Sequence, residues 1–264
     1  MAASPRGGAA RLVIPCVLVP LMAAASAGCA TRGGDTTGAI SAPAPAASEG
    51  DWRREVEVAG ELYRSRPYEA DAAIRYAQAL RAIGQRSQAA AVLEQASLRD
   101  PKNPTLLGAY GRALADAGKF AQALEVLNRA HTPDQPDWRI LSVQGAVLDQ
   151  MSRHEEARRY YASALRLAPD EPSVLSNLGL SYALSKDLKQ AEATLRRADT
   201  GGRMDARVRQ NLALVVGLQG RFAEAETIAR ADLPPEEAAA NVAYLRQMLA
   251  HPKGIAKLPH PGTT

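Results

Sequence analysis

The feature that most constrains the fold is a 34-residue interval that recurs through the middle of the chain. At this interval Gly111, Gly145 and Gly179 follow one another. A second repeat position carries alanine five times, at Ala89, Ala123, Ala157, Ala191 and Ala225. Self-similarity at one fixed period indicates a repeat array, in which stacked units bury a continuous core. We therefore predict five repeats over residues 67–232.

Each repeat contains two short apolar-periodic runs, which predict a pair of helices. In the fourth repeat, Leu175, Leu178 and Gly179 lie on one face of the first predicted helix. Glycine within a helix costs about 1 kcal/mol relative to alanine. Its recurrence at this position therefore predicts close contact between the two helices of a pair.

Glycine also separates the two helices in three repeats, at Gly84, Gly118 and Gly220. Glycine commonly ends a helix in the left-handed conformation, which other residues adopt only at a cost. Ser152 and Lys186 occupy this position in the other two repeats. Their turns are therefore expected either to differ from the glycine turns or to be strained.

The connections between repeats are less regular than the helices. Three Pro-x-x-Pro tetrads begin at Pro101, Pro133 and Pro169, with spacings of 32 and 36 residues. We therefore expect a remodelled loop after Ala130. The segment 199–203 contains two glycines and no proline, and is expected to be the most flexible joint.

The fifth repeat departs from the others, and further helices are predicted at both ends of the array. Arg209 stands where repeats two to four have leucine, and Asp232 stands where they have alanine. Residues 51–66 and 233–250 have helical periodicity without the repeat residues, as expected of helices that cap a solenoid. No segment requires a strand. The predicted fold class is an all-α solenoid with capping helices at both ends.

The repeat residues resemble the tetratricopeptide (TPR) family. The second repeat has Leu107-x-x-Tyr110-Gly111-x-x-Leu114 followed by Ala123. This order of large apolar, Gly and Ala positions is similar to the TPR pattern over about residues 70–232. The resemblance implies a right-handed superhelix of helix-turn-helix repeats, with the first helix of each repeat lining a concave face.

The N-terminus predicts export. Residues 1–28 combine a positive start with an apolar run too short to span a membrane, which is typical of a signal peptide. Small residues before Cys29 resemble a bacterial lipobox, although Ser26 stands where that motif usually has leucine. Lipidation of Cys29 with Ala30 after it implies an outer-membrane lipoprotein that faces the periplasm. Ordinary signal-peptidase cleavage near this site is the alternative. Residues 29–50 are expected to form a flexible linker, and residues 251–264 a disordered tail.

Catalytic chemistry is not expected. The four histidines show no metal-ligand spacing, and no phosphate-binding loop or nucleophile motif is present. His154 occupies the position of Phe120 and Phe222, which predicts a helix-packing role. The arginines are spread over helix faces, which argues against a nucleic-acid partner. We therefore predict a non-enzyme without catalytic residues, metal site or cofactor.

The predicted concave face suggests a binding site for a peptide segment of a partner protein. Arginines there can bind a carboxylate, although scattered arginines are often solvated surface charges. Asn177 and Asn211 share one repeat position, where asparagine either bonds a peptide or holds neighbouring helices. The candidate peptide-binding residues are Arg112, Asp116, Arg139, Ser142, Ser176, Asn177, Arg207 and Asn211.

The residues at the end of the array resemble one particular family of TPR proteins. Residues 211–226, the Leu233-Pro-Pro break and the segment Asn241-Val-Ala-Tyr-Leu are similar to the TadD family. These are TPR lipoproteins of the Flp (tight adherence, Tad) pilus assembly system. The resemblance implies a pilotin- or chaperone-like adaptor toward the outer-membrane secretin or other Tad components. A TPR lipoprotein adaptor of another envelope pathway, such as recruitment of cell-wall hydrolases, is the alternative.

Overall fold

The computed structural model describes residues 48–132, 134–199 and 204–250, all of which belong to one compact unit, Ala46–Thr264. The predicted signal peptide, Cys29, most of the linker and the tail after Ala250 lie outside the described residues. Gly201 and Gly202 of the predicted joint lie outside them too.

The described ranges are helical, with one isolated β-bridge between Thr132 and Gln135 and no other strand pairing. Five helix pairs lie between a first helix, α1, and a last helix, α12. The helices are α1 (Glu49–Ser65), α2 (Ala70–Ala82), α3 (Arg86–Arg99), α4 (Pro104–Asp116), α5 (Phe120–Arg129), α6 (Trp138–Gln150), α7 (His154–Leu167), α8 (Pro172–Leu184), α9 (Leu188–Arg197), α10 (Ala206–Leu218), α11 (Phe222–Ala229) and α12 (Pro235–Ala250). The predicted all-α fold class is confirmed. None of the helices in these ranges has the length and apolar character needed to cross a bilayer.

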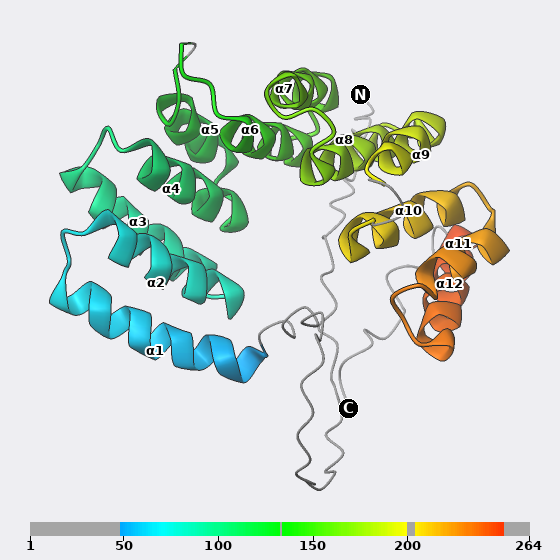
Figure 1. Cartoon of the computed structure of the whole chain (residues 1–264), viewed down its shortest axis with the longest axis horizontal. Helices are drawn as coiled ribbons and strands as arrows, with labels where there is room; N and C mark the ends of the chain where they lie inside the picture. The colour runs from blue at the N-terminus through cyan, green and yellow to red at the C-terminus, as the bar shows by residue number, and fades with distance from the viewer. Residues whose placement is uncertain (1–47, 133, 200–203, 251–264) are drawn as a thin grey trace, which may run out of the picture. The chain divides into compact units, whose positions relative to one another are not determined.

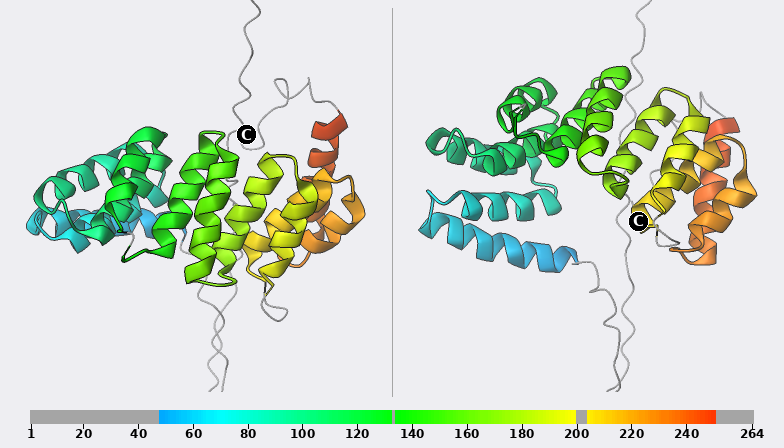
Figure 2. Two further views of the ribbon diagram at one scale, coloured as in Figure 1. Left: turned by 90° about the horizontal axis from the view of Figure 1, so that it is seen from above. Right: turned by 45° about the horizontal axis from the view of Figure 1, so that its top comes forward.

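The first helices of the pairs form the inner row of the array. Each helix packs against its pair partner, and α2, α4, α6, α8 and α10 also contact one another in sequence. Figure 1 shows these five helices on the inner side of the curve and their partners outside. The second view in Figure 2 shows α1 and α12 at opposite ends of the array. The first helices are therefore the elements that present side chains to the concave face.

The recurring glycine brings the two helices of a pair into close contact, as predicted. A Cβ on Gly179 would lie 2.6 Å from Leu195 Cγ and 3.3 Å from the carbonyl oxygen of Ala191. A Cβ on Gly145 would lie 2.6 Å from Tyr161 Cε1. Gly111 is packed in the same way against Leu127. A side chain at these positions would overlap the second helix, which explains why a residue unfavourable for helices recurs there.

The turn inside each pair has a left-handed backbone conformation at the same position, whether or not the residue there is glycine. Gly84, Gly118 and Gly220 have φ of 78°, 76° and 83°, while Ser152 and Lys186 have φ of 61° and 65°. Of the two expected alternatives, strain is therefore the correct one. The turn hydrogen bonds are also retained, as in the bond from Asp187 N to Tyr182 O (2.9 Å).

The two end helices are bound by packing rather than by repeat residues. In α1, Ser48 and Asp51 form a capping box, and Tyr63 stacks on Tyr76 of α2 with ring centroids 5.7 Å apart. In α12, Leu245 occupies the space beside Gly217, so that a Cβ there would lie 2.5 Å from Leu245 Cδ2. The terminal pairs are thus covered on their outer sides.

Candidate functional site

Among the described residues, a pocket of about 800 Å³ lies between the second and third helix pairs. Its walls come from α2, α4, the segment that follows α5, and the start of α6. A Cβ on Gly108 would lie 2.5 Å from Ile140 Cδ1, so glycine lets α4 and α6 approach each other closely beside this pocket. The lining residues are Ile74, Gln78, Lys102, Pro104, Thr105, Gly108, Ala109, Arg112, Arg129, Ala130, His131, Thr132, Gln135, Pro136, Asp137, Arg139 and Ile140.

Helix caps fix the two helices that line this pocket. Asn103 accepts a hydrogen bond from Leu106 N at the start of α4 (3.1 Å), and Pro104 occupies the first helical turn. Asp137 accepts from Arg139 N at the start of α6 (2.7 Å). The Asp137 carboxylate is therefore engaged with the backbone of its own helix.

The pocket carries an excess of positive charge. Its lining includes one carboxylate, Asp137, and four basic side chains: Lys102, Arg112, Arg129 and Arg139. Arg129 donates to the carbonyl oxygen of Pro101 (3.1 Å). Arg139 is exposed, and its guanidinium lies over the Trp138 ring, 4.4 Å from the centroid. This surface is suited to an anionic group.

Arg112 differs from the other three cations because it is half-buried and has no hydrogen bond or ion pair with any residue in the described ranges. Burial lowers its pKa, and the nearby Arg81 charge lowers the pKa further. The carboxylates of Asp116 and Asp137 act in the opposite direction but are engaged elsewhere. Asp116 forms an ion pair with Arg81, and Asp137 caps α6. The Arg112 charge is thus left without a direct partner.

The candidate serines and asparagines bond each other across adjacent first helices. Asn177 Nδ2 of α8 donates to Ser142 Oγ of α6 (3.1 Å). One repeat later, Asn211 Nδ2 of α10 donates to Ser176 Oγ of α8 (2.8 Å). Both serines are buried. This geometry is that of the alternative role, in which the asparagine holds neighbouring helices together.

The candidate residues therefore fall into separate groups. Arg112 and Arg139 share the pocket, and Asp116 adjoins it through its bond to Arg81. The Asn–Ser pairs lie further along the array. Arg207 is exposed near the start of α10 and is not among the pocket residues. Sequence reasoning missed the contributions of Lys102, Arg129 and His131.

The segment after α5 completes the pocket and is held by buried polar contacts. His131 Nε2 lies 3.1 Å from Gln144 Oε1, and Gln144 Nε2 donates to Asn128 Oδ1 (2.8 Å). Gln144 is buried in α6. The uneven spacing of the proline tetrads was the sequence feature that marked this segment. His131 Nδ1 is buried and has no hydrogen-bond partner among the described residues.

Comparison with known families decides what this array is. Three tetratricopeptide repeat models match residues 84–146, 143–205 and 206–231 in succession. The array is a TPR domain. A sequence comparison with the curated proteins gives no match.

Solved structures share the TPR fold at low sequence identity. PilW, a widely conserved type IV pilus biogenesis factor, is 17% identical, with a TM-score of 0.63, over 74% of this chain and 91% of PilW. A thermophilic TPR protein of Thermus thermophilus is 22% identical, with a TM-score of 0.59, over 68% of this chain and 100% of that chain. PilF of Pseudomonas aeruginosa is 19% identical, with a TM-score of 0.50, over 78% of this chain and 87% of that chain. At these identities the likeness shows the fold.

A buried polar network in the third and fourth TPR units was not predicted. Asp149 accepts hydrogen bonds from the Tyr161 hydroxyl (2.9 Å) and the Ser181 hydroxyl (2.8 Å). His154 Nδ1 lies 2.8 Å from Asp149 Oδ1, so the predicted packing residue also contacts a buried carboxylate. Burial raises the pKa of Tyr161 well above its usual value, and the Asp149 charge raises it further. The network couples α6, α7 and α8.

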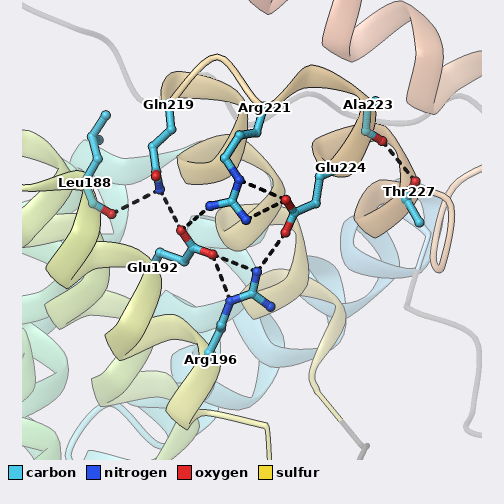
Figure 3. Close-up of polar contacts among 8 residues, drawn as sticks. All are labelled: Leu188, Glu192, Arg196, Gln219, Arg221, Ala223, Glu224 and Thr227. Carbon is cyan, nitrogen blue, oxygen red and sulfur yellow. Dashed lines mark hydrogen bonds and ion pairs between the residues drawn. The ribbon is translucent and has the colours of Figure 1, made fainter.

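A second polar network connects the fourth and fifth TPR units across the segment 200–203. Figure 3 shows Glu192 of α9 at its centre, with Arg196, Gln219 and Arg221 pointing toward its carboxylate. Arg196 and Arg221 also bond Glu224 of α11 (both 2.9 Å). The network fixes α9 against α10 and α11 on both sides of the predicted joint.

Neither network resembles a metal centre. Within residues 48–132, 134–199 and 204–250, no group of three or more His, Cys, Asp or Glu residues is arranged to hold a metal ion. The polar side chains gathered in the TPR core bond one another, while those of the pocket between α4 and α6 remain accessible. The pocket is therefore the part of the described surface best suited to binding.

Proposed function

We propose that this chain is a non-catalytic TPR adaptor in bacterial pilus assembly. The observation that carries the proposal is the fold likeness to PilW, a type IV pilus biogenesis factor, over 74% of this chain and 91% of PilW. A TPR array offers a concave row of helices to a protein partner. The pocket between α4 and α6 supplies a charged site on that row.

The Flp (tight adherence) system is the pilus pathway that we propose. Support comes from the resemblance of residues 211–246 to the TadD family. These residues lie at the end of the array, where the chain departs from the repeat pattern. Arg209, Asp232 and the Leu233-Pro-Pro break are part of this departure from the repeat. The proposed partners are the outer-membrane secretin or other Tad components, toward which the chain acts in a pilotin- or chaperone-like manner.

The proposed location is the periplasmic face of the outer membrane, with Cys29 as the lipidated anchor. Support comes from the apolar leader and the small residues that precede Cys29. Replacing Cys29 with serine should move the chain from the membrane fraction to the soluble periplasmic fraction and remove the acyl mass. Cys16→Ser, inside the leader, is the matched control and should leave fractionation unchanged. The anchor would be excluded by two results together: the Cys29 variant fractionates like the parent protein, and the parent protein carries no acyl mass.

Gene deletion tests the pathway. We expect loss of surface Flp pili and fewer secretin multimers, both restored by the intact gene. Normal pili and normal multimers would reject the pilus role. If the deletion instead impairs cell separation, the chain belongs to a different envelope pathway, such as recruitment of cell-wall hydrolases.

A further inference from the structure

The pocket between α4 and α6 combines positive charge with apolar walls. Arg112 and Arg139 come from the two helices, and the exposed Lys102 and Arg129 also line the pocket. Ile74, Pro104 and Ile140 supply apolar contact in the same pocket. Its volume of about 800 Å³ is within the usual range for ligand sites. A peptide segment with acidic and apolar side chains matches both properties.

The half-buried Arg112 indicates where in the pocket an acidic group of a ligand would bind. A charge removed from water without a partner is costly, and a planar guanidinium is best satisfied by two hydrogen bonds to one carboxylate. The carboxylates of Asp116 and Asp137 are already bonded to Arg81 and to the backbone of Arg139. An incoming carboxylate would thus supply the partner that the folded chain does not.

We propose that this pocket binds an acidic segment of a partner protein, with one carboxylate of that segment bonded to Arg112. This proposal rests on the adaptor function proposed above and names the chemistry of its partner. Arg139, Lys102 and Arg129 surround that carboxylate and attract neighbouring acidic residues. His131, whose ring contacts Gln144 of α6, also lines this pocket.

The test is fluorescence anisotropy with the full chain in mild detergent. The probe is fluorescein-Gly-Ala-Asp-Glu-Leu-Asp-Glu with a free carboxyl terminus. The control probe has Asn and Gln in place of the acidic residues and an amidated end. We expect saturable, salt-sensitive binding of the acidic probe only. Equal binding of both probes, or no binding of either, would overturn the proposal.

Arg112→Gln is the decisive variant. It should weaken binding of the acidic probe by about tenfold or more, because hydrogen bonds between charged groups are among the strongest. Arg86→Gln, on an exposed position of α3 outside the pocket, makes the same charge change and should bind like the parent. Equal binding by the Arg112 variant would contradict the proposal.

Two further measurements distinguish this site from a structural arginine and from a general polyanion surface. The melting temperature of Arg112→Gln should equal or exceed that of the parent, since the variant removes a half-buried unpaired charge. A large decrease would assign Arg112 a structural role and overturn the proposal. Displacement of the probe by a single-stranded oligodeoxynucleotide at equal concentration would identify a general polyanion site and would also overturn it.

The peptide assay and the gene deletion fail independently. Loss of pili on deletion, without binding of the acidic probe, would reject the pocket proposal and keep the adaptor function. Binding of the probe to the parent but not to Arg112→Gln, with normal pili after deletion, would reject the pilus role and keep the acidic-segment site.

Discussion

Arg209 of α10 forms an ion pair with Asp232, which lies between α11 and α12. These are the two positions at which the fifth TPR unit lacks the leucine and alanine of units two to four. The side chains are only 21% and 18% exposed, and Arg209 also donates to the carbonyl oxygen of Met204. The two departures from the repeat thus compensate each other in space.

The pair predicts strong coupling between the two positions. Arg209→Leu alone should lower the free energy of unfolding by about 1–3 kcal/mol, because it leaves the half-buried Asp232 carboxylate without its partner. Arg209→Leu with Asp232→Ala should recover most of this loss, since both residues then match the repeat. A double-mutant cycle in urea measures the coupling. Additive effects of the two changes would show that the pair contributes no specific interaction.

The strained turns predict that two substitutions will stabilise the array. Ser152→Gly and Lys186→Gly should each raise the free energy of unfolding by about 1 kcal/mol, because glycine adopts positive φ without steric cost. The matched control is Gly118→Ser, which introduces the same strain at φ of 76° and should be destabilising. Thermal unfolding of the three variants tests the prediction. A decrease for Ser152→Gly would mean that the serine side chain contributes more than the strain costs.

The sequence predicted the helix pairs because their packing positions recur. Gly179 contacts Leu195, and the same contact is repeated by Gly145 and Tyr161, so one period describes both local structure and packing. The strain at Ser152 was left open, since a sequence shows that glycine is missing but not whether the turn changes.

The compensating contacts could not be predicted in the same way. Arg209 and Asp232 were each recognised as departures, yet their pairing depends on how α10 and the chain after α11 meet. Arg112 was predicted from its repeat position to lie on the concave face. Its lack of a partner follows only from the bonds that occupy Asp116 and Asp137. Asn177 was placed correctly on a first helix, but its bond to Ser142 required the distance between α6 and α8.

The four residues of the Asp149 network occupy positions that carry apolar residues in other units. The matching positions of other units carry Ala115 for Asp149, Phe120 for His154, Leu127 for Tyr161 and Val147 for Ser181. No single replacement identified the network, because each polar residue is common on a helix surface. Together they place one carboxylate and its donors in the core between α6, α7 and α8.

Replacing one residue of the network and replacing all four should have opposite effects on the stability of the array. Asp149→Ala should destabilise the array by about 1–3 kcal/mol, because it leaves buried hydroxyl groups of Tyr161 and Ser181 unpaired. Changing all four residues to their repeat equivalents should restore or exceed the parent stability, since a well-packed apolar set avoids desolvation of the carboxylate. Equilibrium unfolding in urea compares the two variants. Equal destabilisation by both would indicate that these units cannot accommodate the apolar side chains.

The Glu192 network of Figure 3 predicts a dependence of stability on pH. Burial raises the pKa of Glu192, but hydrogen bonds from Gln219, Arg196 and Arg221 more than offset this and lower the pKa from 4.5 to about 2. Since the unfolded chain binds this proton more readily, the contribution is complete above pH 4.5 and is lost as pH falls toward 2. Glu192→Gln should lower stability at neutral pH and reduce the loss of stability across this window.

Measurement of urea unfolding between pH 7 and pH 2.5 tests this linkage. The matched control is Glu125→Gln, an exposed glutamate of α5 that belongs to neither polar network, and it should keep the parent's pH profile. Because Glu192 bonds Gln219 and Arg221 in the turn that joins α10 to α11, its protonation should loosen the fifth TPR unit before the others. Hydrogen exchange should therefore show protection falling first in α10 and α11 as the pH is lowered. Uniform loss of protection over all five pairs would contradict a network that acts at this junction.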